Sequence, residues 1–130
     1  MKVEELRAHP RASLRWPVFL ELDGGFTEGV TKDISEGGAY VCCATPLNPK
    51  AVIHMVIGAP DKSLNVKAKV VWANTYSLNE DITPKGMGVR FLDIAGEDRG
   101  IIAKAVAEHL DKEEDLREQQ NSMLDTLEID

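Results

Sequence analysis

Apolar and polar residues alternate along most of the first 94 positions of the chain. In the segment 13–22, apolar residues occupy every second position, which is the period of a β-strand with one buried face. These residues are Leu14, Trp16, Val18, Leu20 and Leu22. Pro17 has no amide proton, so this strand needs an unpaired position there, at an edge or a bulge. Asp23-Gly24-Gly25 then predicts a tight hairpin, because adjacent glycines supply the positive φ angles of such turns.

Five more short strands are expected downstream of this hairpin. They cover residues 26–34, 39–42, 51–57, 64–73 and 86–91, with turn-forming residues between most of them. Phe26, Val30 and Ile34 form the apolar face of the first of the five. The alternation in 64–73 places Trp72 inward, and we expect both Trp16 and Trp72 in the core. Six short strands separated by turns predict a mainly β fold, a small antiparallel barrel or sandwich.

The hydrophobic period changes from two to that of a helix after Gly96. Glu97 and Asp98 put negative charge where the N-terminus of a helix favours it. Apolar residues then recur at helical spacing as far as Leu110. The pattern predicts a helix over 97–110, packed on the barrel. Beyond it, Ser122 could cap a second short helix.

The length of 130 residues fits one domain with appended structure. We expect a flexible N-terminal arm over 1–12, the barrel and its helix over 13–110, and an acidic, helical tail over 111–130.

The formal net charge is −7, from 22 acidic and 15 basic side chains. Residues 1–96 carry 11 of each sign, so residues 97–130 supply the whole −7. This distribution excludes a uniformly basic nucleic-acid-binding surface, and no nucleic-acid partner is expected.

Several other function classes lack support in the sequence. No apolar run approaches the ~18–20 residues of a membrane span, and no secretory signal precedes the barrel. Cys42 and Cys43 are adjacent, so we interpret them as reduced thiols in a cytoplasmic protein. The histidines have no metal-ligand spacing, and no nucleophile or distinct carboxylate pair indicates catalysis. We therefore expect a protein that is not an enzyme and holds neither a metal nor a cofactor.

Two local motifs are candidates for a ligand-binding site. The first is Arg-x-x-x-Arg, formed by Arg7 and Arg11 in an arm that His9-Pro10 keeps out of a helix. The second is Asp-x-Ser-x-x-Gly, formed by Asp33, Ser35 and Gly38 where a strand ends in a turn. Asp33 and Ser35 are two apart, so strand geometry points both to one face. Gly38 permits a backbone approach that a Cβ atom would obstruct.

In this order, the two motifs resemble those of the PilZ domain family, bacterial receptors for the second messenger cyclic di-GMP. The segment Gly86-Met87-Gly88-Val89-Arg90-Phe91 is also similar to the last barrel strand of that family. The resemblance covers about residues 5–110. It implies a six-stranded antiparallel β-barrel with a C-terminal helix packed on it. It also implies a non-catalytic receptor in bacterial signalling, such as the control of motility or biofilm formation.

The ligand implied by the resemblance suits these residue types. Cyclic di-GMP carries two phosphodiester charges and two guanines. An arginine fork binds phosphate oxygens or the O6/N7 edge of guanine, whereas a carboxylate accepts from guanine N1–H and N2–H. By resemblance, Arg7 and Arg11 would hold the nucleotide from the arm. Asp33, Ser35 and Gly38 would form the fixed wall on the barrel, and arm closure would be the switch.

Several alternatives stay open at this point. Arg11 and Arg15 have the same spacing as Arg7 and Arg11, although we prefer the earlier pair. Leu6 stands where an extra arginine in this family favours two stacked nucleotides, so we expect one nucleotide per site. A PilZ-like interaction module for pilus assembly or motility, which does not use the nucleotide, is the alternative function. The downstream protein partner and the oligomeric state are not specified by the sequence.

Overall fold

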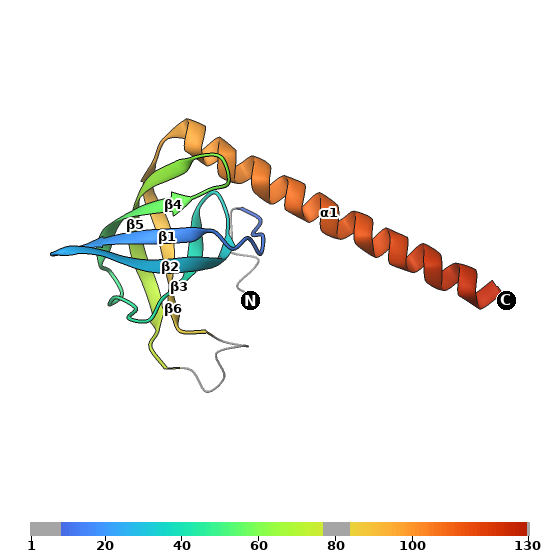
Figure 1. Cartoon of the computed structure of the whole chain (residues 1–130), viewed down its shortest axis with the longest axis horizontal. Helices are drawn as coiled ribbons and strands as arrows, with labels where there is room; N and C mark the ends of the chain where they lie inside the picture. Colours follow the sequence, from blue (N-terminus) through green and yellow to red (C-terminus); the bar gives the residue numbers. More distant parts are fainter. Residues whose placement is uncertain (1–8, 77–83, 130) are drawn as a thin grey trace.

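The computed structural model describes residues 9–76 and 84–129, with the side chains of the long helix described as far as residue 117. Six strands and one helix follow each other along the chain. The strands are β1 (Pro17–Leu22), β2 (Gly25–Ile34), β3 (Gly38–Cys42), β4 (Val52–Gly58), β5 (Ser63–Asn74) and β6 (Gly86–Ile94), and the helix is α1 (Gly96–Ile129). They form a closed antiparallel barrel in the order β1-β2-β3-β6-β5-β4 (Figure 1). The predicted six-stranded barrel with a C-terminal helix is confirmed.

Alternation along the strands builds the core. In β1, Val18 and Leu20 are fully buried, while Phe19 between them keeps 39% of its surface exposed. Trp16 is buried as expected and joins the same apolar cluster as the helix residues Ile102 and Val106. The β1–β2 turn uses Gly24 and Gly25, whose φ angles of 88° and 149° are positive, as the glycine pair predicts.

Two aromatic residues do not lie where the alternation put them. Phe26 is 65% exposed, because it belongs to the β1–β2 hairpin end that extends beyond the barrel (Figure 1). Trp72 is 50% exposed, so its prediction as a core residue is wrong. The pairing of β5 with β6 shifts register between Val70 and Trp72, and Val71 is 49% exposed. A bulge of this kind adds one residue to the strand and turns the following side chain to the opposite face.

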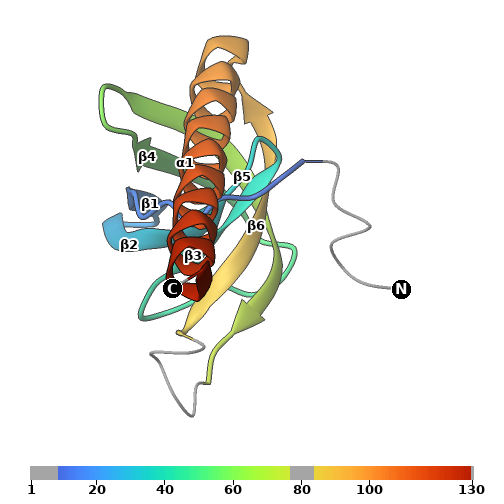
Figure 2. The same ribbon diagram turned by 90° about the vertical axis from the view of Figure 1, so that its right-hand side faces the viewer.

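α1 is one continuous helix, whereas the sequence suggested a helix to Leu110 and a second short one after it. No glycine or proline follows Gly100 to interrupt it. Its first turn is fixed by Asp98, which is 6% exposed and accepts a hydrogen bond of 2.8 Å from Lys62 Nζ in the β4–β5 turn. The first half of α1 lies on the barrel and the second half extends past it (Figures 1 and 2).

Among the described residues, no helix combines the length and the apolar character needed to cross a membrane. In the same part of the chain, no group of three or more His, Cys, Asp or Glu side chains is arranged to hold a metal ion.

Candidate functional site

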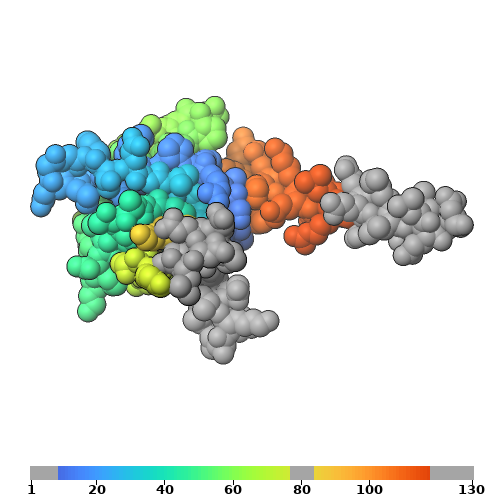
Figure 3. Space-filling view, turned by 60° about the horizontal axis from the view of Figure 1, so that its bottom comes forward, coloured from blue at the N-terminus to red at the C-terminus, as the bar shows by residue number. Residues whose placement is uncertain are grey.

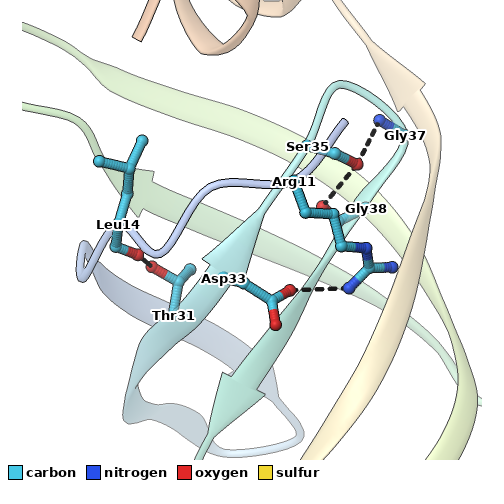
Figure 4. A network of polar contacts seen from close by, with 7 residues as sticks. All are labelled: Arg11, Leu14, Thr31, Asp33, Ser35, Gly37 and Gly38. Carbon is cyan, nitrogen blue, oxygen red and sulfur yellow. Dashed lines mark hydrogen bonds and ion pairs between the residues drawn. The ribbon is translucent and has the colours of Figure 1, made fainter. Parts of the chain in front are cut away.

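The root of the arm is fixed against the end of β2. Ala12 is buried and exchanges two backbone hydrogen bonds with Ile34, of 3.0 and 2.9 Å. A second attachment lies further along, where the fully buried Thr31 hydroxyl accepts the Trp16 N–H at 2.8 Å and donates to the Leu14 carbonyl. These bonds carry the chain from the arm into β1 alongside β2 (Figure 4).

Arg11 brings the two sequence motifs together. Its guanidinium Nη1 donates to Asp33 Oδ1 at 2.7 Å, across 22 positions of sequence (Figure 4). Both side chains are about one quarter exposed, 27% for Arg11 and 28% for Asp33. The ion pair is thus partly shielded from water and still reachable by a ligand. Arg7 lies outside the described residues, so its pairing with Arg11 stays a prediction. Arg15, the second arginine of the alternative Arg11/Arg15 motif, is exposed and lies two residues before β1.

Ser35 and Gly38 shape the turn between β2 and β3. Ser35 is 4% exposed, and its hydroxyl accepts the Gly37 N–H at 3.2 Å and donates to the Gly38 carbonyl at 3.3 Å. Gly38 is buried against β6, where a Cβ atom would lie 2.2 Å from the Val89 carbonyl oxygen. Both residues therefore have an architectural role in the barrel. Their predicted contacts with a ligand remain predictions.

His9 provides a further link between the arm and this turn. Its Nδ1 lies 3.5 Å from Glu36 Oε2. The ring also lies against Gly37, where an added Cβ atom would come within 3.1 Å of His9 Cδ2. From the sequence, His9 was expected to act as a spacer in the arm, with contact to a ligand as the alternative. The arm root is instead held to the turn at both His9 and Arg11.

An aromatic pair beside the ion pair was missed by the sequence analysis. Tyr40 is the cross-strand partner of Asp33, and its ring centroid lies 5.1 Å from that of Trp72 at an interplanar angle of 34°. Gly88 of β6 lies between them as the partner of both Tyr40 and Trp72. A Cβ atom at Gly88 would lie 2.2 Å from Trp72 Nε1, so the glycine lets the indole lie against the barrel wall. Gly88 is the one sequence signal that pointed here.

The electrostatics around Tyr40 are mixed. Lys32 Nζ lies 5.9 Å from the centroid of the Tyr40 ring, within the range of a cation–π contact. The phenol donates to the Pro84 carbonyl at 2.6 Å, and burial raises its pKa. Burial likewise raises the pKa of the Cys42 thiol, two positions further along β3, so it is a weak nucleophile at neutral pH.

The arrangement suits a planar, anionic heteroaromatic ligand. A row of neighbouring strand positions carries a carboxylate on β2, a phenol on β3, a glycine on β6 and an indole on β5. The phenol of Tyr40 is buried at 6% exposed, whereas the indole of Trp72 is half exposed. Carboxylates accept from ring N–H groups, aromatic faces stack on bases, and the guanidinium of the arm can pair with phosphate.

The chain matches the model of the PilZ domain over residues 5–108. This chain belongs to the PilZ domain family. The family assignment agrees with the barrel and with the two motifs that the arm brings together. No curated protein matches the sequence.

Solved PilZ-containing structures share the fold at low sequence identity. The inhibitor of motility MotI/DgrA of Bacillus subtilis has a TM-score of 0.67 and 18% identity, over 88% of this chain and 52% of that one. The PilZ domain of YcgR from Escherichia coli, solved with c-di-GMP, has a TM-score of 0.66 and 15% identity, over 88% and 97%. MrkH, described as a c-di-GMP-dependent transcription regulatory factor, has a TM-score of 0.63 and 20% identity, over 78% and 50%. The chain thus spans about half of MotI/DgrA and of MrkH.

Proposed function

We propose that this protein is a receptor for cyclic di-GMP that changes its interaction with a downstream protein when the nucleotide binds. The observation that carries the proposal is the Arg11–Asp33 contact of 2.7 Å, which joins the arginine motif to the Asp-x-Ser-x-x-Gly motif on one face. The complex of the Escherichia coli YcgR domain with c-di-GMP supports the same ligand for this family member.

Each part of the site has a chemical task in this proposal. Asp33 accepts from N1–H and N2–H of one guanine, a pair of donors that no cation can satisfy. Arg11 and Arg7 bind phosphate oxygens or the O6/N7 edge. Trp72, which is half exposed, offers aromatic surface to a purine, and the buried Tyr40 ring supports the indole. Ser35 and Gly38 hold the wall in shape. One nucleotide per site is proposed, since Leu6 replaces the extra arginine.

Binding changes the partners of the arm. Asp33 neutralises the charge of Arg11 in this structure. A nucleotide that engages Asp33 brings its own negative charge for the guanidinium. The arm then closes over the ligand while the barrel stays unchanged, and this closure is the switch.

The protein acts through a partner in this proposal. PilZ domains are receptor and adaptor modules rather than enzymes. We place the protein in the bacterial cytoplasm, where it would alter motility or biofilm formation through an unidentified protein.

Titration calorimetry with cyclic di-GMP tests the proposal. We expect binding by the wild type and losses of on the order of 2–4 kcal/mol for Arg11→Ala and for Asp33→Ala, the scale of a desolvated charged contact. Arg99→Ala is the matched control and should bind as the wild type does, because Arg99 is an exposed arginine of α1 that belongs to neither motif. Absence of heat at ~100 μM folded wild-type protein would contradict the proposal.

A second function is favoured by one observation. Arg11 and Asp33 already bind each other, and the Ser35 hydroxyl already bonds to the backbone of its own turn. The same contacts would be found in a barrel that uses these residues only for structure. In that case the protein is a protein-interaction module that does not use the nucleotide. Arg11→Ala would then lower the melting temperature, and the wild type would show no binding of cyclic di-GMP.

A further inference from the structure

A groove separates the arm root from α1. Its floor is apolar and its two rim residues are acidic. The apolar lining comes from Pro10, Ala103, Val106, Ala107 and Leu110, and the rim from Glu36 and Asp111. The cavity volume is about 410 Å³, within the range of pockets that hold small molecules or side chains. Figure 3 shows the first described residues, in blue, next to the orange first half of α1.

We propose that Leu6 of this same chain occupies this groove, which we call the arm groove. The docked leucine would tie the arginine arm to α1. Leu6 is an apolar residue between Glu5 and Arg7, and the proposed nucleotide site gives its side chain no contact with the ligand.

The path of the chain supports this occupant. Pro10 is itself part of the groove wall, and His9 contacts Glu36 on the rim at 3.5 Å. The Ala12–Ile34 bonds and the Arg11–Asp33 pair fix the direction in which the chain leaves β2. Leu6 is four residues before Pro10, so an extended chain spans at most about 14 Å between them. The leucine therefore starts from the rim of the groove and has little distance to cover.

Charge favours the arm over a second copy of the protein. Residue 7 is an arginine, and docking of Leu6 would bring it close to Glu36 and Asp111 on the rim. A second molecule that docked through its own α1 would bring the acidic segment 97–130, which carries 11 acidic against four basic side chains. Like charges at such an interface oppose association.

Docking has a consequence for nucleotide binding, and this part rests on the proposed function. An arm that is already held at Leu6 loses less conformational freedom when Arg7 and Arg11 close on a ligand. Because coupling is reciprocal, a partner that pulls α1 away from the arm groove would weaken nucleotide binding, and bound nucleotide would hold α1 in place. A partner that contacts α1 would thus respond to whether the nucleotide is bound.

A disulfide trap tests docking without any nucleotide. In a background with Cys42→Ser and Cys43→Ser, Leu6→Cys is combined with Ala107→Cys, at an exposed groove position. The matched control combines Leu6→Cys with Leu116→Cys, where the leucine is 60% exposed and lies outside the groove lining. We expect an intramolecular disulfide on mild oxidation in the first variant and little in the second. Equal trapping in both, or a disulfide-linked dimer in the first, would overturn the proposal.

Calorimetry with cyclic di-GMP then tests the coupling. We expect Leu6→Ser to weaken binding about tenfold and Leu116→Ser to leave it unchanged. Unchanged affinity in Leu6→Ser would overturn the coupling. If wild-type protein binds no nucleotide but the disulfide forms, the receptor function fails while the docking of Leu6 stands. If the nucleotide binds and no disulfide forms, docking fails while the receptor function stands.

Discussion

Asp33 takes part both in the ion pair with Arg11 and in the proposed contact with guanine. One of its oxygens, Oδ1, accepts a hydrogen bond from Arg11. A carboxylate offers about four lone-pair sites on two oxygens, so it can accept from an arginine and from a guanine edge together. Ligand binding therefore does not require the ion pair to break completely. The arm can remain attached to β2 while the nucleotide enters.

Asp33→Asn should weaken cyclic di-GMP binding by about 10- to 100-fold, roughly 1.4–2.7 kcal/mol. The amide keeps the size of the side chain, but it loses the charge that holds Arg11 and presents an NH₂ donor to a guanine edge that also donates. Calorimetry measures the loss. Glu28→Gln is the control, since Glu28 is an exposed carboxylate on the same strand. Equal effects of the two substitutions would mean that net charge alone governs binding.

Thr31→Val should lower the free energy of unfolding by about 3 kcal/mol. Valine has nearly the same shape, but it leaves the Trp16 N–H and the Leu14 carbonyl without their partner, at about 1–3 kcal/mol for each buried group. Urea denaturation monitored by circular dichroism gives the value. Thr75→Val, at an exposed position outside the strands, should stay within about 0.5 kcal/mol of the wild type.

Tyr40 makes the barrel sensitive to alkaline pH. Burial raises the pKa of its phenol above the ordinary value of 10.0, so the folded state favours the protonated form. The corresponding stability is fully present below pH 10 and is lost as the pH rises through the folded pKa. Tyr40→Phe should therefore lose less stability between pH 9 and pH 12 than the wild type. Urea midpoints across this range test it, and parallel curves for the two proteins would contradict it.

At the scale of elements, the sequence predicted the strands well because one-sided burial leaves a period of two. Val18 and Leu20 of β1 follow it, as does the run from Leu64 to Val70 in β5. Trp72 does not, because the bulge depends on the register in which β5 pairs with β6, and hydrophobic alternation along β5 alone does not report that register. The start of the first strand was placed too early, at residue 13. In the described part of the chain before Pro17, namely residues 9–16, the only β-bridge is the isolated one between Ala12 and Ile34.

The candidate site was only partly visible from sequence for the same reason. Motif spacing identified Arg11 and Asp33, which the fold brings into contact. Tyr40 and Trp72 carry no motif, and their contact arises from the β5 bulge and from the missing side chain at Gly88. The roles of Ser35 and Gly38 in the turn also depend on β6, which is about fifty residues away in sequence.

Gly38→Ala should destabilise the barrel more than Gly88→Ala. At Gly38 the added Cβ atom meets a backbone oxygen at 2.2 Å, and relief requires β3 and β6 to separate. At Gly88 it meets the indole of Trp72, a half-exposed side chain that can rotate away. Thermal denaturation ranks the two variants. Gly88→Ala should also weaken nucleotide binding while the barrel stays folded, and an equal loss of stability in both would contradict the argument.

At the scale of the whole molecule, the barrel and the long helix differ in both charge and shape. Residues 1–96 balance to zero, and the excess of acid lies on and after α1. A helix of 34 residues is about 51 Å long at 1.5 Å per residue, so its far end is several Debye lengths from the barrel at physiological salt. The acidic tail therefore has little electrostatic effect on a nucleotide at the arm under those conditions. Its charge acts where the helix meets other molecules.

Removal of residues 112–130 tests this separation. The deletion takes away seven acidic and two basic side chains but keeps Asp111 and the rest of the arm groove. At ~10 mM salt, where the Debye length is about 30 Å, the loss of negative charge should speed the association of dianionic cyclic di-GMP. At ~150 mM salt the rates of the two proteins should converge, because screening reduces the Debye length to about 8 Å. Stopped-flow measurements using Trp72 fluorescence give the rates. Faster association that persists at high salt would mean that the tail contacts the arm directly and competes with the nucleotide for it.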